Sequence, residues 1–230
     1  MAMNMKVGEF HKYKYIVLMM RQKSRWIIGV DEAGRGPLAG PLTIAVFVAP
    51  KKLRQKLIKV LGGKIKDSKH FSEKRRKEIY KKFKRLRKRG STSLKLYGTS
   101  KIYFFVSHVS NKIIDKRGIS YATNLGIKRA LVNTKRSASN IRLDGLLKAP
   151  EEYKNQKTII RGDSKDIFIA CASIVAKVRR DRLMQRLAKK YPKYHLEIHK
   201  GYGTLLHRHL IKKFGLSDLH RTSFCKNLKI

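Results

Sequence analysis

The sequence has few acidic residues, few cysteines and no long apolar run. Only 15 of its 230 residues are Asp or Glu, against 56 Lys or Arg, and the formal net charge is +41. Two cysteines, Cys171 and Cys225, are too few for a disulfide framework or a thiolate zinc cluster. No apolar run approaches the length of a membrane span, and residues 15–20 are too short and too flanked by charge for a secretory signal. We therefore expect a soluble, cytoplasmic protein.

Positive charge is what the chain has in excess, and it is spread along most of the length. Residues 51–90 alone contain 19 Lys or Arg and three acids. A charge excess of this size attracts polyanions, and nucleic acid is the partner that we expect. The basic residues are not confined to a tail or to one amphipathic helix, which argues against a membrane-surface protein. The length fits one large domain, or one domain with an appendage.

The hydrophobic pattern predicts an α/β fold. Apolar, β-branched runs predict an antiparallel pair of strands at residues 26–30 and 42–48, and further strands at 101–107, 140–144 and 158–160. Apolar residues at helical spacing predict helices after Ser72, over residues 120–132, from residue 167 onwards and around 207–213. Strands that then alternate with helices favour a sheet with helices packed on it.

The most informative stretch is residues 25–41, in which an apolar strand leads into Asp31, Glu32 and a glycine-rich segment. Adjacent side chains on a strand point to opposite faces, so both carboxylates reach one site only if the strand breaks into a turn there. The glycines that follow permit such a turn and a close approach of the backbone to a ligand. Acids in this setting predict a metal site or an acid–base site.

Two further acids, Asp144 and Asp163, also lie beside glycines at the ends of predicted strands. If these strands end at one edge of the sheet, four carboxylates converge there and repel one another unless cations neutralise them. Mg²⁺ is the usual oxygen-liganded ion beside phosphates, and two such ions can activate water and stabilise a leaving oxygen. This pattern favours a metal-dependent nuclease. Taken singly, Asp144 and Asp163 are equally compatible with turn or helix-cap residues.

Several ordered blocks resemble ribonuclease HII, and the likeness extends from residue 26 to about 224. Residues 31–41, DEAGRGPLAGP, are similar to the signature of that family. The other blocks follow in order: DSK at 67–69 before SEKRR at 72–76, LDG at 143–145, RGDS at 161–164, ASIVAKV at 172–178, RDR at 180–182, HKGY at 199–202 and HRTSF at 220–224.

This resemblance implies a ribonuclease H-like fold, with a five-stranded mixed sheet flanked by helices and a small C-terminal helical region. The expected organisation is an N-terminal extension at residues 1–24, a catalytic domain at 25–190, and a helical region at 191–230 that completes the substrate site. The family's metal-binding acids correspond to Asp31, Glu32, Asp144 and Asp163, which would be catalytic and hold two Mg²⁺ or Mn²⁺ ions.

The resemblance also implies the reaction and the substrate contacts. The family cuts the RNA strand of RNA–DNA hybrids and incises duplex DNA 5′ to a single ribonucleotide, leaving a 3′-hydroxyl and a 5′-phosphate. Gly34, Arg35 and Gly36 correspond to the segment that reads the ribose 2′-hydroxyl, and Tyr202 to a tyrosine that stacks near the RNA–DNA junction. We also expect phosphate contacts from a further set of side chains: Lys69, Ser173, Lys177 and Arg180.

Two other functions fit parts of the sequence. A non-catalytic RNA-binding or ribosome-binding protein would explain the charge but gives no reason for acids at strand ends. Another nuclease of the same fold would use the same carboxylates and would cut DNA that contains no ribonucleotide. We expect a monomer, and the sequence identifies no protein partner.

Overall fold

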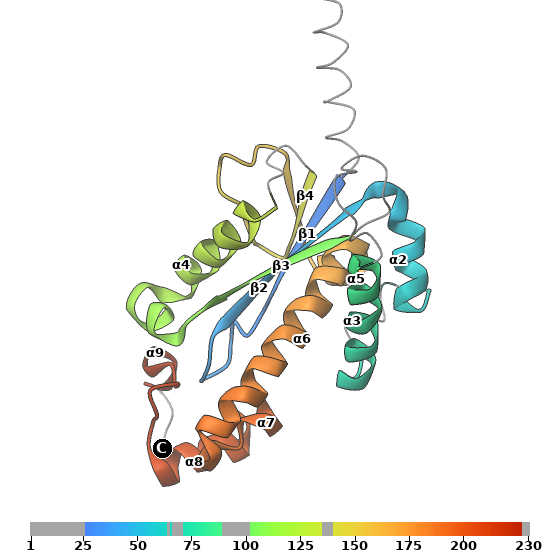
Figure 1. Cartoon of the computed structure of the whole chain (residues 1–230). Helices are drawn as coiled ribbons and strands as arrows, with labels where there is room; N and C mark the ends of the chain where they lie inside the picture. The colour runs from blue at the N-terminus through green and yellow to red at the C-terminus, as the bar shows by residue number, and fades with distance from the viewer. Residues whose placement is uncertain (1–25, 64, 66–70, 89–101, 135–139, 227–230) are drawn as a thin grey trace, which may run out of the picture.

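The computed structural model describes residues 26–63, 65, 71–88, 102–134 and 140–226, which form a mixed sheet between two layers of helices (Figure 1). The expected N-terminal extension and Lys69 lie outside these residues. In the part of the chain that the structure describes, no helix is both long enough and apolar enough to cross a membrane.

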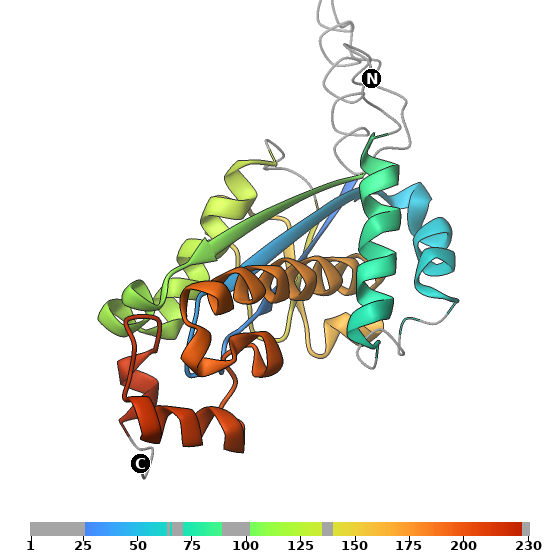
Figure 2. The same cartoon turned by 60° about the horizontal axis from the view of Figure 1, so that its bottom comes forward.

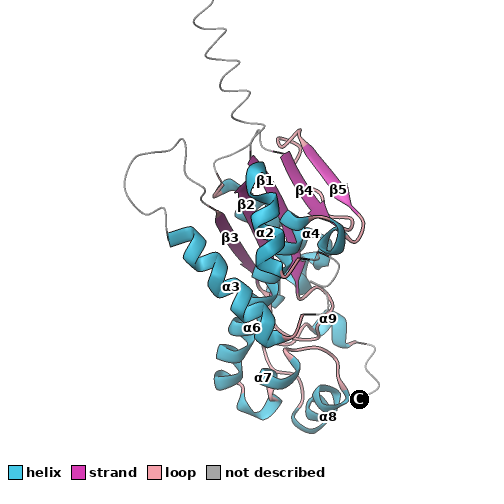
Figure 3. Ribbon diagram, turned by 90° about the vertical axis from the view of Figure 1, so that its right-hand side faces the viewer, coloured by secondary structure: helices cyan, strands magenta, loops and turns pink. Residues whose placement is uncertain are grey.

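The sheet has five strands in the order β3-β2-β1-β4-β5. The strands are β1 (Trp26–Ala33), β2 (Leu42–Pro50), β3 (Tyr103–Val109), β4 (Asn140–Asp144) and β5 (Gln156–Ile159). β2 is antiparallel to both β1 and β3, whereas β4 is parallel to both β1 and β5. The predicted antiparallel pair and the five-stranded mixed sheet are therefore confirmed, with β5 at one edge (Figure 3).

The predicted end of the first strand was wrong. We expected the strand to break after residue 30, but β1 continues through Asp31 and Glu32 to Ala33, because these residues remain paired with Ala45, Ile44 and Thr43 of β2. The turn begins only at Gly34, whose φ of 87° lies in the left-handed region that favours glycine. The third strand also begins at 103 and ends at 109, two residues later than expected.

Helices cover both faces of the sheet. The described helices are α2 (Arg54–Leu61), α3 (Glu73–Lys88), α4 (Asn111–Val132), α5 (Gly162–Lys165), α6 (Ile167–Lys190), α7 (Leu196–His199), α8 (Leu205–Phe214) and α9 (Thr222–Cys225), with short 3₁₀ turns η1 (Lys51–Leu53) and η3 (Pro192–Tyr194). The helix expected at 120–132 is the second part of α4, which is kinked at Gly118. In Figure 1, α4 lies on one face, and α2, α3 and α6 lie on the other.

The long helix α6 packs directly on β1. A Cβ atom at Gly29 would lie 2.1 Å from the carbonyl oxygen of Phe168, so only glycine allows the two backbones to approach this closely. Asp166 caps the helix by accepting hydrogen bonds from the N–H groups of Phe168 and Ile169, and it also pairs with Arg142. This packing fixes the position of α6 relative to the end of β1.

The C-terminal helices lie beyond the far end of α6, near the turn that follows β1 (Figure 2). Main-chain hydrogen bonds connect the two regions: Leu38 N–H donates to Gly201, Gly40 N–H to Leu219, and Arg221 N–H to Leu38, at 2.8, 3.0 and 2.7 Å. The last part of the chain is thereby attached to the glycine-rich turn.

Candidate active site

The acids meet at one edge of the sheet because β1 and β4 are parallel. Val30 is aligned with Leu143, so Asp31 and Asp144 follow as the next residues on neighbouring strands. Asp144 Oδ1 accepts hydrogen bonds from the N–H groups of Gly162 and Asp163, at 2.6 and 3.3 Å. The structure thus places Asp31, Glu32 and Asp144 close together at the carboxyl edge, with the main chain of Asp163 beside Asp144, although β1 does not break where we expected.

Asp31 is the more buried of the two acids on β1, with 4% of its surface exposed. Burial raises the pKa of its carboxyl well above the usual value, and the nearby charges of Glu32 and Asp144 raise it further. Ser173 and Lys177, both on α6, act on this pKa in the opposite direction. The Ser173 hydroxyl lies close enough to lower the pKa, but it makes no hydrogen bond of standard geometry.

Glu32 has a carboxylate oxygen without a protein partner. Its Oε2 is buried and accepts no hydrogen bond, while Oε1 lies 3.9 Å from an Arg35 guanidinium nitrogen. Burial raises the pKa of Glu32; Arg35 lowers this pKa and Asp144 raises it. A buried, unsatisfied carboxylate oxygen is costly unless another group, such as a cation, approaches it.

These acids fit the donor set of a hard divalent ion, because all their ligating atoms are carboxylate oxygens. Across the described ranges, no three Asp, Glu, His or Cys side chains already stand in an arrangement that holds a metal. The fit therefore rests on the unsatisfied Glu32 oxygen and on the mutual repulsion among Asp31, Glu32 and Asp144.

The turn after β1 presents two residues to solvent. Gly34 is buried, and a Cβ there would lie 1.9 Å from Nε of Arg180. Arg35 and Gly36 are exposed. In the segment expected to read the substrate, Gly34 therefore packs against the guanidinium of Arg180, whereas Arg35 and Gly36 face solvent.

Arg180 was expected to contact phosphate, but its place in the fold favours another role. Its side chain is 1% exposed and donates hydrogen bonds to the carbonyl oxygens of Pro41 and Ala39, at 3.2 and 3.4 Å. Its guanidinium also lies 5.4 Å from the ring centroid of Tyr202, which is 47% exposed. Arg180 thus stabilises the turn and packs against the ring of Tyr202. It is too buried to contact a phosphate group.

Ser173 and Lys177 differ in their access to a ligand. Ser173 is 3% exposed and faces Asp31, whereas Lys177 is partly exposed one helical turn further along α6. Of the expected phosphate contacts in the described residues, Lys177 is the one with both a charge and an open surface.

Arg221 is a residue that sequence reasoning did not single out, although the block at 220–224 had been noted. It is fully buried, and its guanidinium donates four hydrogen bonds to the turn after β1. Nη2 donates to Gly34 at 2.6 Å, Nη1 to Arg35 at 2.8 Å, and Nε and Nη2 both to Gly40 at 3.0 and 2.8 Å. Burial, followed by the charge of Arg180, lowers the pKa of Arg221 to about 10, so the group remains charged at neutral pH.

Three buried histidines, at positions 199, 207 and 220, lie under the segment that carries Tyr202. Nδ1 of His220 accepts from the N–H of Ser217 at 2.9 Å, so the neutral ring carries its proton on Nε2 and donates to Nε2 of His207 at 3.1 Å. His207 then carries its proton on Nδ1 and donates to the carbonyl oxygen of Tyr202 at 2.9 Å. The His199 ring stacks on His207 with centroids 4.1 Å apart.

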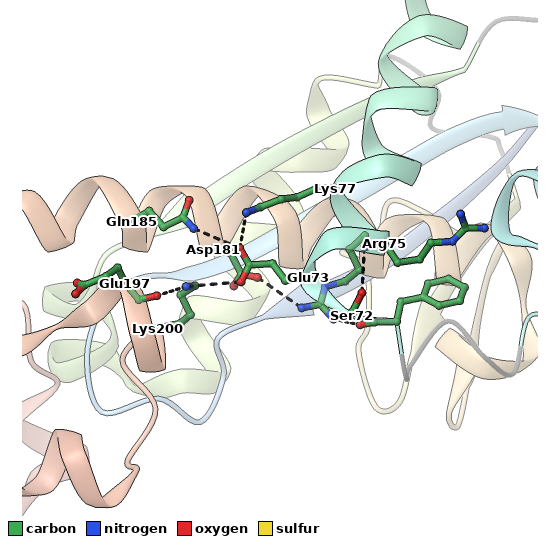
Figure 4. A network of polar contacts seen from close by, with 10 residues as sticks. Ser72, Glu73, Arg75, Lys77, Asp181, Gln185, Glu197 and Lys200 are labelled. Atoms are coloured by element: carbon green, nitrogen blue, oxygen red, sulfur yellow. Dashed lines mark hydrogen bonds and ion pairs between the residues drawn. The ribbon is translucent and has the colours of Figure 1, made fainter.

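A polar network joins three of the sequence blocks that resemble ribonuclease HII (Figure 4). Glu73, at the start of α3, contacts Lys77 at 2.5 Å, Lys200 at 3.8 Å and Gln185 at 3.3 Å. Arg76 pairs with Asp181 of α6 at 3.8 Å. The blocks at 72–76, 180–182 and 199–202 are therefore adjacent in space.

Comparison with known proteins identifies the family of the chain. The family model described as Ribonuclease HII matches residues 28–227. The chain belongs to the ribonuclease HII family. A ribonuclease HII of Caldicellulosiruptor bescii is 39% identical over 210 residues, covering 91% of each chain, and one of Prochlorococcus marinus (strain MIT 9215) is 44% identical over 199 residues, covering 86% of this chain and 89% of that one.

Solved structures share the fold at lower identity. The PCNA:RNase HII complex from Archaeoglobus fulgidus gives a TM-score of 0.68 at 24% identity, covering 89% of this chain and 97% of that one. Bst-RNase HIII in complex with Mn²⁺ gives 0.61 at 18% identity, covering 86% and 66%. The ribonuclease H-like fold is thus confirmed, and family membership makes the protein an endonuclease with ribonuclease H activity towards RNA–DNA hybrids.

Proposed function

We propose that this ribonuclease HII incises duplex DNA 5′ to a single ribonucleotide, in addition to cutting the RNA strand of hybrids, and that it uses two Mg²⁺ or Mn²⁺ ions. The observation that carries the proposal is the unsatisfied, buried carboxylate oxygen of Glu32 among the acids at the carboxyl edge of the sheet. Asp31, Glu32, Asp144 and Asp163 would hold the ions. When bound, the ions supply Lewis-acid activation of a water molecule and stabilisation of the leaving oxygen.

The reaction is a hydrolysis. The water oxygen forms a bond to phosphorus and gives up a proton to solvent. The bond from phosphorus to the 3′-oxygen breaks with its electron pair on that oxygen, which takes up a proton from solvent to become the 3′-hydroxyl, and the 5′-phosphate is left on the other strand end. Asp31, Glu32, Asp144 and Asp163 would hold the ions beside the scissile phosphate, and the partly exposed Lys177 of α6 offers a positive charge to that phosphate. A phosphate contact from Lys69 stays a prediction, and Ser173, on α6, lowers the pKa of Asp31.

Substrate selection belongs to the exposed residues above this site. Arg35 and Gly36 face solvent at the turn, where backbone N–H groups can meet a ribose 2′-hydroxyl, the group that distinguishes RNA from DNA. Tyr202 offers an exposed ring face for stacking at the junction. We propose that the helical region at 191–230 completes the substrate site, because Tyr202 and the hydrogen bonds to Leu38 and Gly40 come from it.

The experiment that tests this proposal uses a labelled DNA duplex with one ribonucleotide, incubated with the protein and Mg²⁺ or Mn²⁺. The controls are the same duplex without the ribonucleotide, and EDTA. We expect incision 5′ to the ribonucleotide that EDTA abolishes and that the all-DNA control lacks. Binding without incision in either metal would indicate a non-catalytic RNA-binding protein, and cutting of the control would indicate a different nuclease.

The Asp31→Asn variant gives a second test with the same duplex. Asn keeps the size of the side chain but removes the charge at the centre of the acid cluster. We expect turnover to be lost while duplex affinity stays within about twofold, because phosphate binding depends on the basic surface. Near-normal turnover by this variant would refute the role of Asp31.

A further inference from the structure

Arg221 lies directly beneath the turn that presents Arg35 and Gly36. All four hydrogen bonds that its guanidinium donates end on main-chain carbonyl oxygens of that turn. Burying a cation is costly unless hydrogen bonds satisfy it, and here a second cation, Arg180, lies close enough to oppose its charge. The hydrogen bonds to the carbonyl oxygens of Gly34, Arg35 and Gly40 offset this cost, and they keep these carbonyls directed toward the buried Arg221 guanidinium.

The direction of these carbonyls determines the direction of the neighbouring N–H groups. The described peptide bonds are all trans, and in a trans peptide unit the C=O and the N–H point in opposite directions. The Gly34 carbonyl shares its peptide unit with the N–H of Arg35, and the Arg35 carbonyl shares its unit with the N–H of Gly36. Because both carbonyls point to Arg221, both N–H groups point away from it.

Both N–H groups are open to a ligand. Arg35 and Gly36 are exposed, and a Cβ at Gly36 would meet nothing within 4 Å. In the region that the structure describes, neither N–H donates to another group of the protein. A cation on the carbonyl side also polarises each peptide unit, which strengthens the N–H as a donor.

We propose that Arg221 is a positioning residue for ribonucleotide recognition, which aims the N–H groups of Arg35 and Gly36 at the 2′-oxygen of the substrate by holding their carbonyl partners inward. This inference rests on the proposed function, because it concerns how the same site distinguishes a ribonucleotide from a deoxyribonucleotide. Arg221 itself touches no substrate, since it is fully buried.

The test measures the affinity of two duplexes that differ only in one 2′-hydroxyl. The parent is the full-length Asp31→Asn protein, which we expect to bind without turnover, and Arg221→Gln and Arg221→Lys are made in that background. The readout is the ratio of the two dissociation constants, all-DNA over ribonucleotide-containing, obtained by fluorescence anisotropy. We expect the ratio to fall about tenfold in Arg221→Gln and less in Arg221→Lys, with all-DNA affinity unchanged within about twofold.

A matched control separates positioning from a loss of stability. Leu131→Ala in the same background removes a fully buried side chain near the C-terminal end of α4, and it should lower the melting temperature without changing the ratio. A ratio that is the same in Arg221→Gln as in the parent, whatever its size, overturns the proposal. Equal falls in the ratio for Leu131→Ala and Arg221→Gln also overturn it.

A second measurement needs no substitution at position 221. In the parent protein labelled with ¹⁵N, the amide signals of Arg35 and Gly36 should shift with the ribonucleotide duplex and not with the all-DNA duplex. Equal shifts with both duplexes contradict the inference even if Arg221→Gln does not fold. Failure of the proposed function is distinguishable, because it appears as absence of incision by the unmodified protein.

Discussion

Protonation of the buried histidines should destabilise the protein below neutral pH, and His207 allows the size of this effect to be calculated. His207 is fully buried, and burial, with the neighbouring His199, lowers its pKa from 6.5 to about 4. Its Nε2 accepts the hydrogen bond that His220 donates, so a proton added to this nitrogen would face the N–H of His220 and break that hydrogen bond. The folded protein therefore keeps this ring neutral over a range in which the unfolded chain protonates it.

The sign follows from proton binding. Between pH 6.5 and about 4 the unfolded chain binds more protons at this position than the folded protein, so stability decreases as pH falls through this range. With 1.36 kcal/mol for each pKa unit, lowering the pH from 7.5 to 5 removes about 2 kcal/mol of the His207 contribution. Burial likewise lowers the pKa values of His199 and His220, which adds changes of the same sign.

The assay compares the wild type with His207→Gln by urea denaturation at pH 7.5 and pH 5. The raised pKa values of Asp31 and Glu32 change stability in the opposite direction on acidification, so only the difference between the two proteins isolates the histidine. We expect the stability deficit of His207→Gln to shrink by about 2 kcal/mol at pH 5. The control is Leu210→Ala in the same helix, which removes buried apolar surface but no titratable group, so its stability deficit should be the same at both pH values. An equal deficit of His207→Gln at both pH values would refute the reasoning.

Two other predictions follow from the packing and the charge of the site. Gly29→Ala should destabilise the protein by about 3 kcal/mol or prevent folding, because its Cβ would lie 2.1 Å from the Phe168 carbonyl oxygen; a melting temperature within about two degrees of the wild type would contradict this. Lys177→Gln should weaken binding to all duplexes alike and reduce the slope of log K against log salt by about 1, measured by anisotropy between 50 and 200 mM salt. An unchanged slope would show that Lys177 makes no phosphate contact.

The acid cluster was predictable from sequence because its geometry depends on rules of strand order. Asp31 and Asp144 both follow apolar runs, and parallel strands bring their carboxyl ends to one edge. The prediction that the strand breaks after residue 30 was wrong, because the pairing of β1 with β2 continues to Ala33. The local sequence does not indicate where pairing with a neighbouring strand ends. The acids still meet, since β4 places Asp144 close to both Asp31 and Glu32.

Arg180, Arg221 and the histidines could not be assigned from sequence for a different reason. In a chain with 56 Lys or Arg, nothing local distinguishes an arginine that is fully buried from one that faces solvent. Their roles depend on partners far away in the chain, such as the carbonyls of Gly34 and Pro41. For Arg221 the one usable signal was the block at 220–224, which marked the segment without indicating its chemistry.

The hydrogen bonds of Arg221 join residues separated by 181 to 187 positions, so the turn after β1 depends for its shape on a residue made much later. Contacts between such distant residues form late, because the intervening chain must first be ordered. During synthesis, the acids of β1 emerge from the ribosome long before residue 221 does. A nascent chain therefore has the carboxylates of β1 but not yet the hydrogen bonds that arrange the turn, which can form only after residue 221 has been made.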